Sequence, residues 1–185
     1  MTELRNAVIA ALALTVIFGL AYPLTMTGAA QVLFPDKADG QAKLVAQDYS
    51  DDAGLFQARP SVTGYAADAT FFNNQGPNQQ ALADQLSGFV GEYLEREGPY
   101  NPGLAAADIP PDAVTTSASG IDPHISEENA LLQAGRVAEE GGVPRERVLE
   151  LIEEHSSRPL LGLAGDRSIN VVELNEALGG EAAGR

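Results

Sequence analysis

The stretch Ala7–Leu24 limits what this chain can fold into more than any other feature. It holds 18 residues without a charge, and the charge-free run around it extends from Asn6 to Pro35. As a helix it would be about 27 Å long at 1.5 Å per residue, which nearly spans the roughly 30 Å hydrocarbon core of a bilayer. The chain therefore begins with either a retained membrane anchor or a cleaved export signal.

The cleaved signal is the less favoured of the two interpretations. A secretory signal has a basic start, an apolar core of about 7 to 15 residues and a small-residue cleavage site. Here Arg5 is offset by Glu3 and the apolar core is longer than usual, although Thr27-Gly28-Ala29 and Gly28-Ala29-Ala30 both fit a cleavage site. An exported soluble hydrolase or binding protein therefore stays as the alternative.

The end of the apolar stretch favours an anchor. Phe18 and Tyr22 lie there, where a Tyr ring can sit at the membrane interface. Pro23 follows, at a position where a helix can end or kink. Both interpretations place the rest of the chain outside the cytoplasm.

The composition after this stretch predicts one acidic domain. Its length of roughly 150 residues is a common size for a single globular domain. The formal net charge of the chain is −15, and it contains no cysteine. Nucleic-acid binding needs phosphate neutralisation, so nucleic acid is excluded as a partner. Without disulfides, the domain must be stabilised by its core and its partners.

The apolar periodicity predicts four helices after the membrane stretch. One is expected over Leu82–Leu94, with its end at Gly98-Pro99. A second is capped by Ser126 and ends at Gly141-Gly142. A third has Pro144 as its first residue and ends before Pro159. The last helix is expected over Ile169–Leu178 and should end at Gly179-Gly180. Its first residues could begin as a strand.

Few strands are expected. Leu44–Ala46 and Val114–Thr116 are the plausible short strands. The predicted fold is therefore a single N-terminal transmembrane helix followed by one extracytoplasmic α+β domain with few strands.

The catalytic patterns are weak. Ser119 with His124 or His155 and Asp122 could form a hydrolase triad, but residues 116–120 lack the first Gly of G-x-S-x-G, so a serine-rich turn is the better interpretation. Asp122 and His124 could bind a metal, yet no second spaced cluster accompanies them. His155 lies on the apolar side of its helix, which is typical of a packed histidine.

Two ligand-binding loops can also be compared with the sequence. Residues 48–59 resemble a calcium loop, but Ala53 replaces the Gly of its sharp turn and Arg59 replaces its last Glu, so a solvated acidic turn is expected. No G-x-x-x-x-G-K-[ST] phosphate loop occurs in the sequence.

Taken together, the motifs along the chain resemble one known family. They comprise Gly19 with Tyr22-Pro23-Leu24, Phe56 with Arg59-Pro60-Ser61, the loop 76–78, the run 116–126, residues of the helices expected over 130–138 and 148–155, and the run 170–178. In this order they are similar to the C subunit of the Kdp potassium-transporting P-type ATPase, the KdpC family, over most of the chain.

The resemblance implies residues that matter, without assigning their individual roles. Those of the membrane helix, expected to dock the subunit, are Phe18, Gly19, Tyr22 and Pro23. Those of the domain, called the motif residues below, are Arg59, Pro60, Ser61, Asn78, Ser119, Gly120, Asp122, Gln133, Arg136, His155, Asn170, Glu173 and Asn175.

The resemblance also implies a function and a topology. Residues 1–6 would be cytoplasmic, 7–27 would cross the inner membrane once, and 28–185 would form the outer domain. The chain would be a non-catalytic subunit beside a channel-like potassium-binding A subunit and an ATP-hydrolysing B subunit, acting as a catalytic chaperone that raises the ATP affinity of the B subunit. No cofactor would be bound directly, and ATP and K+ would be bound at the level of the complex. Any effect on ATP would then have to be transmitted through the membrane helix or the potassium-entry subunit.

Overall fold

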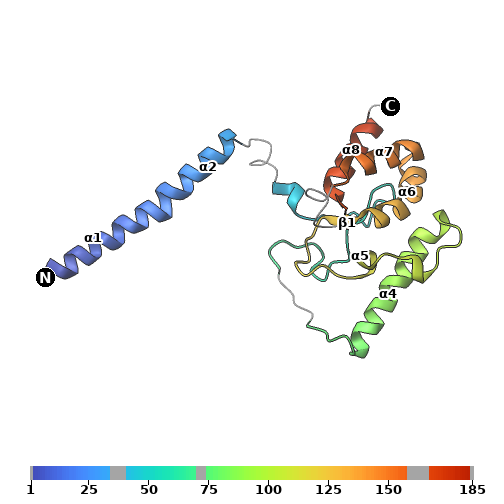
Figure 1. The fold of residues 1–185 in the computed structure, drawn as a ribbon, viewed down its shortest axis with the longest axis horizontal. Helices are drawn as coiled ribbons and strands as arrows, with labels where there is room; N and C mark the ends of the chain where they lie inside the picture. The colour runs from blue at the N-terminus through green and yellow to red at the C-terminus, as the bar shows by residue number, and fades with distance from the viewer. Residues whose placement is uncertain (1, 34–40, 70–73, 158–166, 184–185) are drawn as a thin grey trace. The chain divides into compact units, whose positions relative to one another are not determined.

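The computed structural model describes residues 2–33, 41–69, 74–157 and 167–183 (Figure 1). The chain divides into two compact units, residues 1–41 and 42–185. Residues 36–40, whose sequence Asp-Lys-Ala-Asp-Gly predicts a turn, lie outside the described residues.

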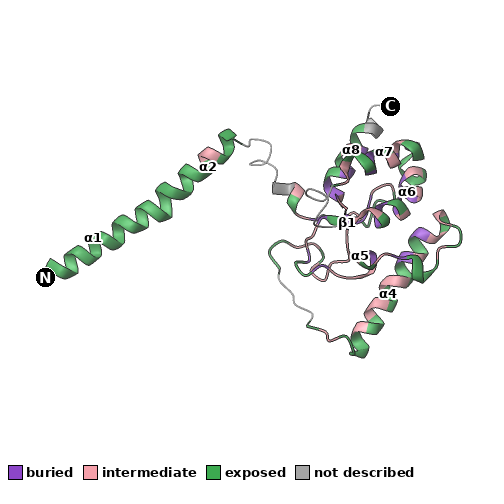
Figure 2. Ribbon diagram, viewed as in Figure 1, coloured by how far each residue is buried: buried purple, intermediate pink, exposed green. Residues whose placement is uncertain are grey.

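The first unit is one long helix. It consists of α1 (Thr2–Val16), a π-helical turn η1 (Ile17–Ala21) and α2 (Tyr22–Leu33). Its 32 residues are long and apolar enough to cross a membrane. Nearly all of them are exposed (Figure 2), so the apolar surface of this helix is left for lipid or for a partner.

Pro23 neither ends nor breaks this helix, contrary to one expectation from the sequence. A helical proline lacks an N–H, and its ring collides with the carbonyl four residues earlier, here that of Gly19. The preceding turn widens instead, because the Tyr22 N–H donates to the carbonyl of Ile17, five residues back. A π turn of this kind makes room for the ring and lets the helix continue to Leu33.

The second unit is mostly helical with one small sheet. Its long helices are α4 (Gln80–Glu97), α6 (Glu127–Gly141), α7 (Arg145–His155) and α8 (Val171–Ala183). Its short helices are η2 (Gln41–Leu44), η3 (Gly98–Tyr100), η4 (Ala106–Asp108) and α5 (Pro111–Val114). Strands β1 (His124–Ser126) and β2 (Ser168–Asn170) pair antiparallel, with Ile125 opposite Ile169. The expectation of helices with few strands is confirmed.

Both predicted strands are wrong. Leu44 ends the helix η2, and Ala46 makes a single backbone bond, to the Ile121 carbonyl at 2.9 Å, in place of a ladder. Val114 ends α5, which two prolines begin. The observed strands have only three residues each. The strand β2 confirms that the segment from Ile169 could begin as a strand, whereas β1 is too short for an alternating pattern to reveal it.

The predicted helices are present, with two corrections at their ends. Ser126 caps α6 by accepting the Asn129 N–H at 3.1 Å, and Gly142 ends it with a left-handed φ of 65°. Pro144 is the N-cap of α7 and not its first residue. The last helix runs past Gly179-Gly180 to Ala183. Neither glycine has a positive φ, so each costs the helix only about 1 kcal/mol relative to Ala.

The main core lies between α6, α7, α8 and the sheet. On α6, Ala130, Ala134 and Val137 follow at helical spacing and are fully buried. They pack with Val148 and Ile152 of α7 and with further residues from α8, β1 and β2. Phe56, from an irregular segment, completes this core. A smaller core under α4 contains Tyr93, Ile109 and Ala113.

Candidate functional site

The four residues expected to dock the membrane helix lie on or beside its π turn. Phe18 and Gly19 belong to that turn, and Tyr22 and Pro23 begin the next helix. The exposed fractions of Phe18 and Tyr22 are 64% and 58%. A Cβ atom added at Gly19 would meet only Thr15 Cγ2 of the same helix, at 3.8 Å, so the Gly19 backbone is open to close approach.

In the domain, two motif residues hold an irregular segment by its backbone. Asn175 of α8 accepts the Phe56 N–H at 2.9 Å and donates to the Phe56 carbonyl at 3.0 Å. Gln133 of α6 does the same for Gln57, at 2.8 and 3.1 Å. These two pairs of bonds, called the amide clamps below, take the place of a strand ladder. They satisfy backbone groups that burial would otherwise leave unpaired.

A buried ion pair lies beside the amide clamps. Arg136 Nε donates to Glu97 Oε1 at 2.9 Å, and the two side chains are 2% and 0% exposed. Arg136 also donates to the carbonyls of Ala53 and Leu55 and to Gln133 Oε1. Removing one partner of such a pair leaves a buried charge and typically costs about 3–5 kcal/mol. Arg136 thus fixes both the end of α4 and the segment that leads into Phe56.

The same network continues toward the domain surface. Asn129 accepts from Tyr93 Oη at 3.1 Å and from Gln133 Nε2 at 2.9 Å, and donates to Asp112 Oδ2 at 3.0 Å. Burial, with the nearby Glu97 charge, raises the pKa of Tyr93 above its ordinary value of 10.0. Tyr93 therefore stays a neutral hydroxyl donor.

Arg59 joins two loops. Its Nη2 lies 3.2 Å from Thr115 Oγ1 and close to the carbonyls of Thr115 and Thr116. Its Nη1 lies 3.6 Å from Asp122 Oδ2. Two residues further along the chain, Ser61 Oγ donates to the Gly120 carbonyl at 2.6 Å. The motif residues Arg59 and Ser61 thus lie beside Gly120 and Asp122, although about sixty residues of sequence separate the two pairs.

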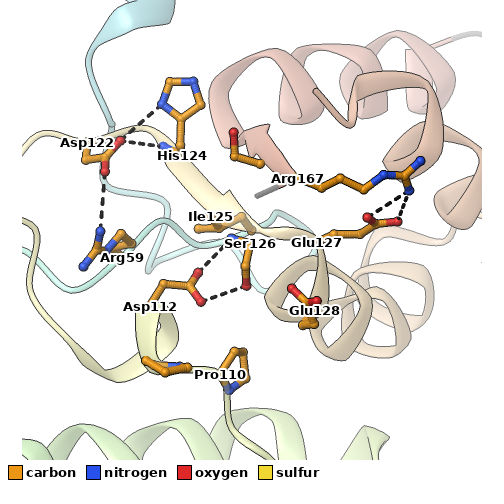
Figure 3. Close-up of a pocket in the computed structure, with 12 residues that line it drawn as sticks. Arg59, Pro110, Asp112, Asp122, His124, Ile125, Ser126, Glu127, Glu128 and Arg167 are labelled. Carbon is orange, nitrogen blue, oxygen red and sulfur yellow. Dashed lines mark hydrogen bonds and ion pairs between the residues drawn. The ribbon is translucent and has the colours of Figure 1, made fainter. Parts of the chain in front are cut away.

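These loops open onto a hollow of about 790 Å³ (Figure 3). In it, Asp122 lies between Arg59 and His124, whose Nδ1 is 3.2 Å from Asp122 Oδ1. Opposite, Arg167 Nη1 donates to both oxygens of Glu127, at 2.8 and 3.0 Å. Bonds to Glu127 and Glu153 raise the pKa of Arg167. The charged groups that line the hollow are largely paired with one another.

The hollow brings together part of the possible hydrolase triad. Asp122 and His124 are adjacent, but Ser119 is not among the residues that line the hollow, and its Oγ accepts the Ile121 N–H at 3.2 Å. Ser126 does line it, with its hydroxyl donating to Asp112 Oδ1 at 2.8 Å while capping α6. Both serines act here as turn and cap residues. Among the described residues, no three His, Cys, Asp or Glu side chains are grouped as metal ligands would be.

The remaining motif residues are spread over the domain. Asn170 caps α8 by accepting the N–H groups of Val172 and Glu173 at 2.9 and 3.2 Å, and its amide donates to the Lys43 carbonyl. Glu173 is exposed in the first turn of α8, where a carboxylate suits the helix dipole. His155 is half-buried, with Nδ1 2.9 Å from the Leu151 carbonyl. Pro60 lines a smaller pocket beside Tyr93, and Asn78 lies exposed in the turn before α4.

Several residues of the network were not predicted from the sequence. Glu97 follows Tyr93 by four residues, so it lies in phase with the apolar stripe of α4. A carboxylate in that position of the sequence indicates a buried charge, which needs a partner of opposite charge. Asp112 and Asn129 gave no comparable signal, because their partners come from distant segments.

Comparison with known proteins shows which family the chain belongs to. A family model described as KdpC, K+-transporting ATPase, c chain, matches residues 4–180 and so includes nearly all of the long N-terminal helix. A potassium-transporting ATPase KdpC subunit of Polaromonas naphthalenivorans is 42% identical, with 95% of this chain and 93% of the relative covered. Those of Rhodopseudomonas palustris and Nitratidesulfovibrio vulgaris are 42% and 39% identical, over at least 96% of each chain. The chain therefore belongs to the KdpC family of potassium-transporting ATPase subunits.

Proposed function

We propose that this chain is the non-catalytic C subunit of a high-affinity, ATP-driven potassium uptake complex, which it assembles or stabilises. The observation that carries the proposal is the exposed 32-residue helix at residues 2–33, joined to a domain whose motif residues mostly hold its own fold together. Its partners are the channel-like potassium-binding A subunit and the ATP-hydrolysing B subunit.

The proposed topology is a single pass through the inner membrane. Residues 1–6 are cytoplasmic, 7–27 cross the bilayer and 28–185 form the extracytoplasmic domain. The absence of a charge between Asn6 and Pro35 supports this span, because an ionised side chain is costly in hydrocarbon. The acidic domain, with the whole formal net charge of −15, then lies on the side from which potassium enters.

We further propose that the subunit raises the ATP affinity of the B subunit as a catalytic chaperone. An extracytoplasmic domain cannot reach cytoplasmic ATP, so ATP and K+ are bound at the level of the complex. The effect on ATP is then a coupling free energy transmitted by the membrane helix or by the A subunit.

Reconstitution tests the proposal. The full-length chain and a form that lacks residues 1–30 are each expressed with the other subunits of the complex, and copurification and potassium-dependent ATPase activity are measured. The full chain should copurify and lower the KM for ATP, whereas the truncated form should do neither. Equal copurification and equal KM for the two forms would contradict the assembly role.

Mass spectrometry of the purified subunit tests retention of the helix. An intact N-terminus is expected. A mature protein that begins near Ala30 or Gln31 would favour the exported soluble protein instead.

A further inference from the structure

The π turn leaves one backbone carbonyl of the membrane helix without a regular donor. In an α-helix the Phe18 carbonyl would accept from the Tyr22 N–H, but this N–H donates to Ile17. The next residue along, Pro23, has no N–H to offer. The Gly19 carbonyl also loses its usual donor, because position 23 is the one that would supply it.

This carbonyl lies where a membrane is driest. Phe18 is one residue, or about 1.5 Å along the helix axis, from the middle of the proposed span 7–27. Headgroups and bulk water begin about 15 Å from the bilayer centre. An unpaired carbonyl at this depth is costly, and neighbouring helices are among the groups that can satisfy it.

The threonine hydroxyls that lie nearest to the π turn on either side are used elsewhere. Thr15 Oγ1 donates to the Ala11 carbonyl at 2.8 Å, and Thr25 Oγ1 donates to the Ala21 carbonyl at 2.7 Å. Within the described residues 2–33, neither hydroxyl is directed to Phe18 or Gly19. The donor must therefore come from outside this helix.

The surface beside the carbonyl suits another helix. Gly19 has no side chain, and a Cβ placed there would meet only Thr15 of its own helix, so a neighbouring backbone can come close. Phe18 and Tyr22 stand exposed beside it. A potassium ion is a poorer occupant, because one turn offers at most two such carbonyls, whereas selectivity filters use whole rings of them.

We propose that the Phe18 carbonyl accepts a hydrogen bond from a hydroxyl, amide or indole side chain on a transmembrane helix of a partner subunit, which packs against Gly19. This inference rests on the proposed function, because it names the chemistry of the partner at the docking site. The π turn is then a recognition element, complementary to a polar residue in an otherwise apolar partner helix.

Three variants of the full chain, expressed with the other subunits, test the docking geometry. Gly19→Leu blocks close approach, and Pro23→Ala restores an N–H that can close the turn and occupy the free carbonyls. Ile17→Ala is the matched control, because the Ile17 side chain lies about 160° around the helix from Gly19 and about 100° from Phe18 at 100° per residue. The first two should lower the association constant about 3- to 20-fold, and the control should leave it unchanged.

A labelling experiment reads the hydrogen bond directly. Phe18-Gly19 is the single Phe-Gly pair in the sequence, so carbonyl-13C phenylalanine combined with 15N glycine selects the Phe18 carbonyl in solid-state NMR. Its 13C shift should move downfield, toward hydrogen-bonded values, when the chain in lipid is assembled into the complex. An unchanged shift on assembly overturns the inference, as does a hydrogen-bonded value already present in the chain alone.

The two levels of failure are separable. Wild-type chain that does not copurify with any partner contradicts the proposed function and this inference with it. Wild-type chain that copurifies while Gly19→Leu and Pro23→Ala copurify equally well contradicts only the inference.

Discussion

At the scale of single residues, Gly120 lacks both the room and the backbone conformation for a side chain. Its φ is +74°, and an added Cβ would lie 2.6 Å from Thr63 Oγ1. Gly120→Ala should therefore lower the free energy of unfolding by about 1–3 kcal/mol. Chemical denaturation of the full chain in detergent, followed by circular dichroism, measures this.

Gly103→Ala is the matched control for Gly120. Gly103 has a φ of +90° but open space around its Cβ position, so it shares the conformational cost without the contact. A cost at Gly120 no larger than at Gly103 would show that the contact with Thr63 has no energetic effect.

Tyr93 gives the domain a dependence on alkaline pH. Burial raises its pKa above 10.0 in the folded state, so the unfolded chain loses this proton first. The contribution of Tyr93 to stability is therefore complete below pH 10 and is lost as the pH rises above that value. Denaturation curves across this range should show the free energy of unfolding falling.

Tyr93→Phe should reduce that slope. It should also cost about 1 kcal/mol at neutral pH, because the bond to Asn129 is lost. Some slope remains, since the pKa values of Tyr49 and Tyr65 are also raised. An unchanged slope in the variant would assign the alkaline loss to those other tyrosines.

At the scale of elements, the amide clamps join α6 and α8 to a segment without secondary structure. Asn175→Leu removes one clamp and leaves the buried Phe56 N–H and carbonyl unpaired. We expect a loss of about 2–4 kcal/mol, since each unpaired buried group costs about 1–3 kcal/mol. Hydrogen exchange should quicken most at the Phe56 amide.

Glu173→Gln controls for a change on the same helix. Its side chain is exposed, and such substitutions usually stay within about 0.5 kcal/mol. Equal stability of Asn175→Leu and Glu173→Gln would mean that water replaces the clamp without cost.

The same elements show which parts of the fold the sequence could predict. The helices α4, α6 and α7 were predictable because their apolar period and the Ser126 cap are local signals. The amide clamps were not, because their partners are 76 and 119 residues apart and a bond to irregular backbone leaves no periodic trace. The π turn was missed for another reason: a proline pattern indicates a break, whereas one widened turn removes the collision.

The candidate site was predictable as a set of residues but not as an arrangement. The resemblance selected Gln133, Arg136 and Asn175 without roles, and the structure shows that all three hold the segment around Phe56. Glu97, the buried partner of Arg136, was missed because most acids that end a helix are solvated.

At the scale of the whole molecule, the net charge of −15 predicts a dependence on salt. Like charges repel in the compact state more than in the unfolded chain, and screening shortens their range from about 30 Å at 0.01 M to about 3 Å at 1 M salt. The unfolding temperature of the full chain in detergent should therefore rise with added KCl. Choline chloride is the control: an equal rise indicates screening, and a rise with KCl alone would contradict it and indicate specific potassium binding.

The amide clamps also set an order of events during synthesis. Asn175 follows Phe56 by 119 residues, which at about 5–20 residues per second means a delay of roughly 6 to 24 s on the ribosome. During that interval the Phe56 ring, which ends fully buried, has neither its clamp nor its core. The domain therefore reaches its final fold only after its last helix is made. A chain that stops before Asn175 remains an unfinished intermediate, open to chaperones and proteases.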